Sequence, residues 1–272
     1  MNKSQIVIGT ASWGSRINFK ESMQVSASLL ELGINHFDTA PLYGSGYSHY
    51  ILNKIGKQNN ILIDTKYGQN THLNWRELFK RFYRFINFKT FKYSFKHIRF
   101  NKHVRLKKDF WDIQKLNNAY NLFSDELDKC KISTFYLHGP PKYILDYKYL
   151  QNFSAFCSTK NVIPGICGPD QENLDMLIEK FPNIKLQMPI EFFWKNREKI
   201  LKSSNKIDIF RIFKKIINDR KNNQYNLKKF WHEFLNIIET NSKYKLVLGI
   251  NSKNSIEKLR KIIENTNNLF NI

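Results

Sequence analysis

The sequence has few of the residues that mark secreted, metal-binding or membrane-spanning chains. It holds three cysteines, Cys130, Cys157 and Cys167, with no CxxC spacing, so we expect no disulfide partner and no metal site. No apolar run approaches the roughly 18 residues that a membrane span needs. The opening MNKSQIVIGTA runs straight into a strand-like segment and has no signal-peptide architecture. These absences predict a cytoplasmic protein.

Acidic residues are also scarce. The chain has 23 Asp and Glu against 44 Lys and Arg, which gives a formal net charge of +21. That excess favours anionic partners such as phosphates, acidic glycans, anionic lipid or nucleic acid. The alternative is compositional drift towards Lys on solvated helix faces, which requires no partner. With 42% hydrophobic residues among 272, the chain is an ordinary globular one that can bury a sizeable core.

Short β-branched segments alternate with segments of helical period. Strands are predicted at 5–11, 36–40, 61–68, 134–139, 162–168, 184–189, 206–213 and 244–251. Helices are predicted at 21–33, 47–56, 115–129, 145–157, 171–181, 227–240 and 254–265, with a weaker one near 194–203. Gly33 stands where a helix C-cap glycine belongs, and Asp170 where an N-cap belongs. Eight strand–helix units predict a single α/β domain over residues 1–272, a (β/α)₈ TIM barrel.

One long connection interrupts this alternation, and it predicts an insertion at 70–112 after the third strand. Residues 69–110 carry twelve Lys and Arg against Glu77 and Asp109, with Phe and Tyr between them. A connection of this length is functional or mobile. Three interpretations remain open: a solvated helical pair, an amphipathic element at 73–111 that docks on the anionic inner membrane surface, and a lid over an anionic substrate. Nucleic acid is the least favoured partner, because no recognised module accompanies the basic residues.

Functional side chains of such a barrel lie at the carboxyl ends of its strands. Those ends carry Asp38, Lys66, His138, Cys167 and Gln187, and Tyr43 follows the second strand. A phenol is a poor acid at neutral pH, but a neighbouring ammonium lowers its pKa. Asp38 would keep Lys66 charged, Lys66 would make Tyr43 more acidic, and His138 would position the oxygen that Tyr43 protonates. The glycines beside Tyr43 would leave it uncrowded at the mouth.

Each of these residues also has a structural explanation. Asp38 suits an Asx-turn, Lys66 a protein surface, His138 a satisfied core position, and Tyr43 ordinary packing. The coincidence of all four at successive strand ends favours proton-transfer chemistry. GxxxxGK[ST], HExxH and GxSxG motifs do not occur in the sequence.

The residues at these strand ends also form a recognisable pattern. Residues 33–40 read Gly-Ile-Asn-His-Phe-Asp-Thr-Ala, and Tyr43-Gly44, Thr65-Lys66 and Leu137-His138 follow. In this order the pattern resembles the aldo-keto reductase family, from about residue 6 to residue 264. The likeness is greatest to short bacterial members that carry a basic insert after strand three, some of which accompany surface-polysaccharide genes.

The resemblance implies an NAD(P)H-dependent oxidoreductase that reduces an aldehyde or ketone, or oxidises the alcohol. Its catalytic tetrad would be Asp38, Tyr43, Lys66 and His138, with Tyr43 as the proton donor. NADPH is the implied cofactor, with NADH not excluded, and the substrate is a small carbonyl compound, anionic or sugar-like if the chain acts in sugar or surface-polysaccharide metabolism. The implied cofactor-binding residues are Asp38, Gln187, Cys167, Gly168, Gly249, Asn251, Ser252 and Lys253.

The chain departs from the family pattern after strand five, where Cys167-Gly168 replaces the usual Ser-Asn. One hydrogen-bonding amide is therefore missing from the expected nicotinamide site. This departure and the large insertion leave a second hypothesis open: a barrel that binds a nicotinamide nucleotide or an anionic surface as a sensor or scaffold, without turnover.

Overall fold

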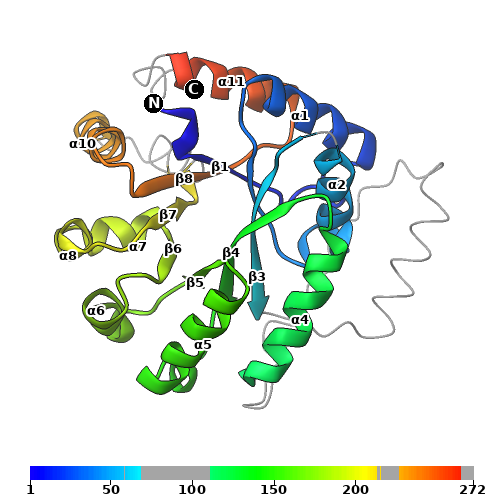
Figure 1. Cartoon of the computed structure of the whole chain (residues 1–272). Coiled ribbons are helices and arrows are strands. Elements are labelled where there is room, and N and C mark those ends of the chain that lie inside the picture. The colour runs from blue at the N-terminus through cyan, green and yellow to red at the C-terminus, as the bar shows by residue number, and fades with distance from the viewer. Residues whose placement is uncertain (58, 69–110, 213–214, 216–226, 265–272) are drawn as a thin grey trace.

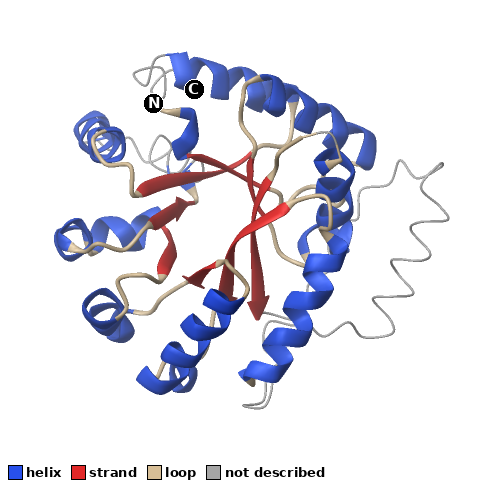
Figure 2. Cartoon of the chain, in the orientation of Figure 1, coloured by secondary structure: helices blue, strands red, loops and turns tan. Residues whose placement is uncertain are grey.

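The computed structural model describes the whole chain except residues 58, 69–110, 213–214, 216–226 and 265–272. Eight parallel strands close into a barrel in the order β1 to β8, each paired with the next and β8 with β1 (Figures 1 and 2). The strands are β1 (Ile6–Gly9), β2 (His36–Asp38), β3 (Leu62–Gly68), β4 (Lys131–His138), β5 (Ile163–Cys167), β6 (Lys185–Pro189), β7 (Ile207–Phe210) and β8 (Tyr244–Gly249). The predicted (β/α)₈ barrel is confirmed.

Helices surround the barrel (Figure 2). They are α1 (Phe19–Glu31), α2 (Tyr47–Gly56), α4 (Ile113–Glu126), α5 (Tyr147–Thr159), α6 (Gln171–Lys180), α7 (Ile190–Lys195), α8 (Arg197–Lys202), α10 (Leu227–Glu239) and α11 (Lys253–Glu264). Three short 3₁₀ segments, η1 (Lys3–Gln5), η2 (Tyr43–Gly46) and η4 (Lys142–Ile144), complete the described elements. The helix predicted near 194–203 proves to be two short helices, α7 and α8, which meet at Asn196.

Local sequence fixes the ends of the helices. The Asn18 side chain accepts a hydrogen bond from the Glu21 N–H at 2.9 Å, and the Glu21 carboxylate accepts one from the Asn18 N–H, so α1 starts with a capping box. At its other end Gly33 has φ 77°, and the N–H of Ile34 reaches back to the Leu29 carbonyl. This is the predicted glycine cap. Asp170 caps α6 as predicted, through a 2.8 Å hydrogen bond from the Asn173 N–H.

Alternation along each strand separates two environments. On β4, the Phe135 ring packs outward against aromatic rings of α4 and α5, including Tyr120 and Phe153. The next residue, Tyr136, points into the barrel and reaches Asp208 of β7. On β3, Thr65 likewise faces His49 of α2, while Lys66 lies inside. The apolar core therefore lies between strands and helices, and the strand side chains of β3 and β4 that face inward are polar.

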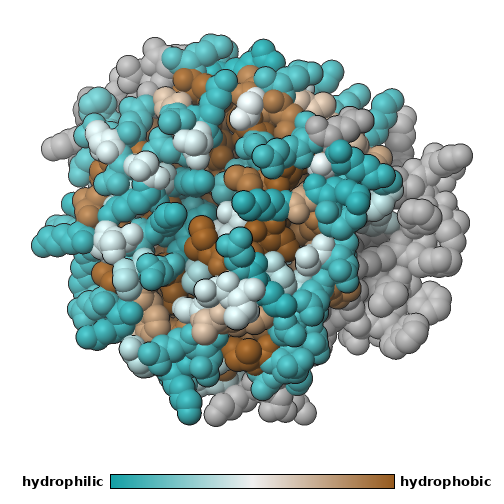
Figure 3. Space-filling model, in the orientation of Figure 1, coloured by the Kyte–Doolittle hydropathy of each residue, from teal (hydrophilic) through white to brown (hydrophobic). Residues whose placement is uncertain are grey.

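Most of the predicted insertion lies outside the described residues, so its three interpretations stay predictions. Its described end at 111–112 joins the barrel: Trp111 is buried and Asp112 caps α4 through the Gln114 N–H at 2.7 Å. Among the described residues no helix is long and apolar enough to cross a membrane. Figure 3 shows mainly hydrophilic residues over the face in view, with hydrophobic ones between them.

Candidate active site

Asp38 and Lys66 form a buried ion pair at the carboxyl end of the barrel. Asp38 is the last residue of β2, and its Oδ1 accepts hydrogen bonds from Lys66 Nζ and, at 2.7 Å, from Gln187 Nε2. Lys66 Nζ also donates to the Thr39 carbonyl at 3.1 Å. Both charged side chains are almost fully enclosed, with relative exposures of 4% for Asp38 and 1% for Lys66. A pair so buried must be mutually compensated, since a lone charge there would be costly.

The environment keeps Lys66 charged. Burial alone disfavours the ammonium, but the Asp38 carboxylate and, to a lesser degree, Tyr43 outweigh burial, so the pKa of Lys66 is raised above its ordinary value. This agrees with the expectation that Asp38 holds Lys66 as a cation. Lys66 Nζ lies 5.2 Å from the centroid of the Tyr43 ring, so the ammonium and the phenol are neighbours.

The phenol of Tyr43 is less acidic than the sequence suggested. Burial raises its pKa to about 12, while the Lys66 ammonium pulls it down by a smaller amount and Asp38 adds to the rise. Lys66 acts in the expected direction, but the prediction of a net lowering is wrong. The reason is that the phenolate loses more by leaving water than it gains from a cation that Asp38 already compensates. Tyr43 is consequently a fully protonated donor at neutral pH.

Backbone packing explains the glycine after Tyr43. Tyr43 opens η2 and is half-buried. Gly44 has φ 58°, and a Cβ at this position would lie 1.7 Å from the Trp13 carbonyl oxygen. Gly44 is therefore required because the η2 backbone lies directly against the loop after β1. Its role is close backbone approach, and the expectation that the glycines leave Tyr43 uncrowded stays a prediction.

His138 ends β4 beside these residues. Its pKa is lowered to about 3, first because the imidazole is buried and second because the Lys66 ammonium repels a second positive charge. The residue as a whole keeps intermediate exposure, but the imidazole is desolvated enough to be neutral at physiological pH. A neutral imidazole carries one N–H donor, so His138 can give a hydrogen bond to an oxygen without changing its charge.

The residues expected around the nicotinamide lie on β5 and β6. Cys167 and Gln187 are register partners, so they are neighbours across the sheet. Burial raises the pKa of Cys167 to about 12, which keeps it a neutral thiol. Gln187 was expected to contact the carboxamide, and in this structure its amide N–H groups include the donor to Asp38. A Cβ on Gly168 would meet no atom within 4 Å, which leaves open space beside Cys167.

The second group of expected cofactor residues follows β8. Gly249 ends the strand next to Gly9 of β1, and a Cβ on Gly249 would also meet open space. The Ser252 hydroxyl accepts a hydrogen bond from the Ser255 N–H at 3.1 Å and caps the start of α11. The N–H of Ser252 itself donates to the Ser255 hydroxyl at 2.9 Å. Asn251, Ser252 and Lys253 are exposed at this helix start.

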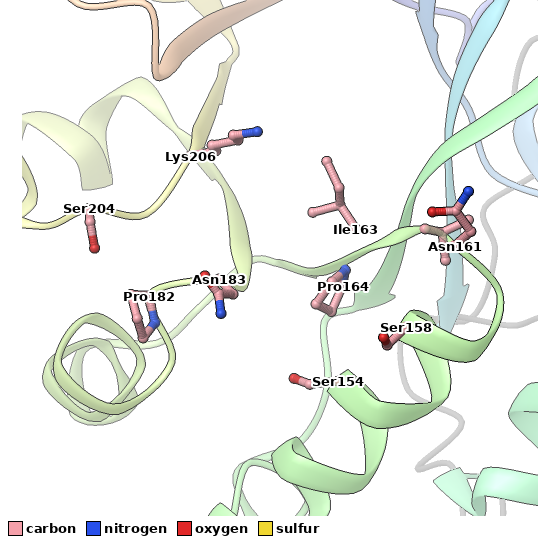
Figure 4. A pocket seen from close by; sticks show the side chains of 10 residues that line it. Ser154, Ser158, Asn161, Ile163, Pro164, Pro182, Asn183, Ser204 and Lys206 are labelled. Atoms are coloured by element: carbon pink, nitrogen blue, oxygen red, sulfur yellow. The ribbon is translucent and has the colours of Figure 1, made fainter.

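A cavity of about 510 Å³ lies at the other end of the barrel. It is lined by residues at the starts of β5, β6 and β7, among them Ile163, Asn183 and Lys206, and by Ser154 and Ser158 of α5 (Figure 4). None of the predicted site residues lines it. Within the described residues no group of three or more His, Cys, Asp or Glu is placed to hold a metal ion.

The sequence reasoning did not pick out the side chains just below the tetrad. Tyr136 lies two residues before His138 and Asp64 two residues before Lys66, so each shares a strand face with a predicted residue. Lys185 stands in the same relation to Gln187. This two-residue spacing is a signal that the sequence already contains. All three side chains are buried inside the barrel.

Comparisons with known proteins give one partial family match and several similar folds. Residues 5–90 match the model of the aldo/keto reductase family. The matched segment includes Asp38, Tyr43 and Lys66 and ends before His138. This stretch of the chain therefore resembles the aldo/keto reductase family. No curated protein matches its sequence.

Solved aldo-keto reductases share the fold of this chain. Glycerol dehydrogenase AKR11B4 from Gluconobacter oxydans superposes with a TM-score of 0.62 at 13% identity, covering 95% of this chain and 86% of that one. Aldo-keto reductase AKR11C1 from Bacillus halodurans, in its holo form, gives 0.61 at 14% identity, with 96% and 86% covered. A Klebsiella pneumoniae aldo-keto reductase in complex with NADPH gives 0.57 at 9% identity, with 93% and 82% covered.

Proposed function

We propose that this protein is an NAD(P)H-dependent oxidoreductase that reduces an aldehyde or ketone, or oxidises the corresponding alcohol. The observation that carries the proposal is the Asp38–Lys66 ion pair with the protonated phenol of Tyr43 beside it. A buried acid held next to a cation is suited to giving up its proton only when a stronger base arrives. The alkoxide that forms when a carbonyl takes up hydride is such a base.

The site has room for a nicotinamide cofactor. Gly168 and Gly249 stand at strand ends where a Cβ would meet nothing, so a flat ligand can approach the backbone there. We propose that Asp38, Gln187, Cys167 and Gly168 face the nicotinamide. Gly249, Asn251, Ser252 and Lys253 would hold the adenosine phosphate, with the start of α11 favouring negative charge. The bound reduced nicotinamide supplies the hydride, and NADPH is the expected form.

Each member of the tetrad then has one task. Tyr43 donates its proton to the carbonyl oxygen, and Lys66 stabilises the phenolate that remains. Asp38 keeps Lys66 charged and fixes its position through the buried ion pair. His138, neutral beside Lys66, donates a hydrogen bond that orients the carbonyl oxygen towards Tyr43. Burial of the pair strengthens these electrostatic effects because little water competes.

Replacing Tyr43 by Phe tests this function. Tyr43→Phe keeps the ring beside Lys66 and removes the proton donor. Oxidation of NADPH with a panel of aldehydes should slow by about 10² to 10⁴-fold in kcat, the usual contribution of a positioned acid. The KM should change much less, since the phenol acts in the transition state.

The same experiment also tests the alternative function, a nucleotide-binding sensor or scaffold without turnover. If both proteins reduce a carbonyl at equal rates, Tyr43 is not the proton donor. If NADPH fluorescence reports tight binding and neither protein turns over any carbonyl, the barrel acts as a nucleotide-binding sensor or scaffold. The neutral Cys167 thiol, a weaker hydrogen-bonding group than an amide, is the feature that favours this second function.

We further propose that the substrate is anionic or sugar-like, as the net charge of +21 favours. The insertion at 70–112 belongs to the same domain in this proposal and contributes much of the charge. Deletion of residues 72–110 gives the test. A rise in KM for anionic carbonyl compounds, with no rise for neutral ones, supports a role in substrate capture. Loss of sedimentation with anionic liposomes, at unchanged kcat/KM, indicates membrane docking instead.

A further inference from the structure

The layer of side chains beneath the tetrad is ionic. We call it the lower layer and define it by five buried residues, one on each of β2, β3, β4, β6 and β7: His36, Asp64, Tyr136, Lys185 and Asp208. Barrels of this class usually fill these positions with Val, Ile and Leu. Charged groups in a sealed interior are costly unless they are paired, so the lower layer calls for a specific explanation.

The lower layer is held together by direct contacts. Lys185 Nζ lies 2.9 Å from Asp64 Oδ2 and 2.7 Å from Asp208 Oδ2. The Tyr136 hydroxyl donates a hydrogen bond to Asp208 Oδ2 at 2.9 Å. On the other side His36 Nε2 lies 3.0 Å from Asp64 Oδ1, and Lys245 Nζ lies 3.2 Å from His36 Nδ1. Lys185 therefore bridges both carboxylates, and Lys245 lies beside His36.

Tyr136 is the member of the lower layer that also approaches the tetrad. Its ring centroid lies 5.9 Å from Lys66 Nζ and 5.7 Å from Lys185 Nζ, so both ammonium groups contact the same ring. The ring is fully buried. The ring packs closely against the Gly165 backbone, because a Cβ on Gly165 would lie 2.4 Å from Tyr136 Cδ1. Gly165 therefore leaves the space that the ring occupies.

The Lys66 ammonium has several neighbours besides the Tyr136 ring. Its Nζ donates to Asp38 and to the Thr39 carbonyl and lies near the Tyr43 ring. The Tyr136 ring lies near both Lys66 Nζ and Lys185 Nζ, and Lys185 in turn binds the two carboxylates of the lower layer. The π face of the ring attracts the Lys66 ammonium.

We propose that Tyr136 is a positioning residue for Lys66: its ring, packed against Gly165, keeps the ammonium at Asp38 and beside Tyr43. The proposal rests on the proposed reductase function for its kinetic consequences. The contact itself is independent of that function. With the ring removed, Lys66 is drawn inward towards Asp208 and Asp64, and Tyr43 loses the cation that stabilises its phenolate.

Two substitutions separate the ring from the hydroxyl. Tyr136→Phe keeps the ring and removes the hydrogen bond to Asp208, so the melting temperature should fall while kcat stays within about threefold of the wild type. Tyr136→Leu removes the ring, and kcat should fall about 100-fold, the effect of roughly 1 Å of misplacement. The KM of the carbonyl should change less than about threefold, because the loss falls on the transition state. The solvent deuterium isotope effect on kcat should rise in Tyr136→Leu, because proton transfer from Tyr43 becomes slower.

A purely structural role gives a different result. The proposal is overturned if kcat falls equally in both variants, in step with the melting temperature, and the solvent isotope effect is unchanged. Should Tyr136→Leu fail to fold, Tyr136→Met fills the space with an unbranched side chain and carries the same expectation.

A stability measurement tests the contact without any turnover. Lys66→Met, Tyr136→Leu and the double variant form a cycle of melting temperatures. If Lys66 and the ring interact, the double variant loses less than the sum of the two single losses. Additive losses overturn the proposal even if the enzyme is active. Coupled losses in a protein that reduces no carbonyl support the contact and reject the reductase function.

Discussion

The two polar layers inside the barrel contain similar ion pairs in different surroundings. In the upper layer Asp38 and Lys66 are paired, and the partly exposed Tyr43 and His138 lie beside them. In the lower layer Lys185 joins Asp64 and Asp208, and all three are almost fully buried. The upper pair thus lies beside a partly exposed phenol and imidazole, whereas the ion pairs of the lower layer are enclosed. The comparison teaches that the two layers differ in access to solvent more than in the type of charge they hold.

The largest expected effect comes from removing Lys185, the cation that two carboxylates of the lower layer share. Lys185→Met leaves Asp64 and Asp208 buried without their shared cation, so the free energy of unfolding should fall by about 3–5 kcal/mol. Urea unfolding measures this loss. Lys199→Met is the matched control, because its pair with Asp175 is exposed and should be worth less than about 1 kcal/mol. Equal losses in the two variants would mean that the buried ion pairs of Lys185 contribute no more to stability than the exposed ion pair of Lys199.

A smaller effect is expected from filling the space beside the Tyr136 ring. Gly165→Ala places a methyl group into that ring, which Asp208 and the neighbouring strands hold, so about 1–3 kcal/mol of stability should be lost. Gly249→Ala is the control, since its Cβ would meet open space, and its stability should change by less than about 0.5 kcal/mol. Calorimetric or urea unfolding of both variants measures the difference. No loss in Gly165→Ala would show that the ring moves freely, contrary to the close contact.

The effect that is smallest at neutral pH, and that grows only as the solution is acidified, concerns His138. Its pKa is about 3 in the folded protein and near 6.5 in the unfolded chain, so the unfolded state binds the extra proton first as pH falls. Stability linked to His138 is therefore fully present above pH 6.5 and is lost as pH falls towards 3, at no more than about 1.4 kcal/mol per pH unit. The stability of His138→Asn, measured over the same pH range, should fall less steeply. Parallel profiles would show that His138 is as easily protonated in the folded state as in the unfolded chain.

Much of the upper layer was predictable because strand ends have a local signature. The apolar segments before Asp38, Lys66 and His138 are strands, and parallel strands of a closed barrel bring their ends together. Gly33 and Asp170 were predictable for the same reason, since caps depend on a few neighbouring residues. The lower layer shows the same two-residue spacing, but nothing in the local sequence says that Tyr136 meets Asp208, 72 positions away.

The sequence by itself determined the eight-fold alternation, the order of the strands and the residues at the barrel mouth, because each depends on short-range periodicity and chain order. Only the tertiary structure decided how those residues behave. Tyr43 keeps its proton because burial outweighs the attraction of Lys66, and His138 stays neutral because burial and the same cation act together. Gly44 and Gly165 are required by atoms of Trp13 and Tyr136, which lie far from them in the chain. Desolvation, charge pairing and close packing depend on neighbours in space, and these exist only once the barrel has closed.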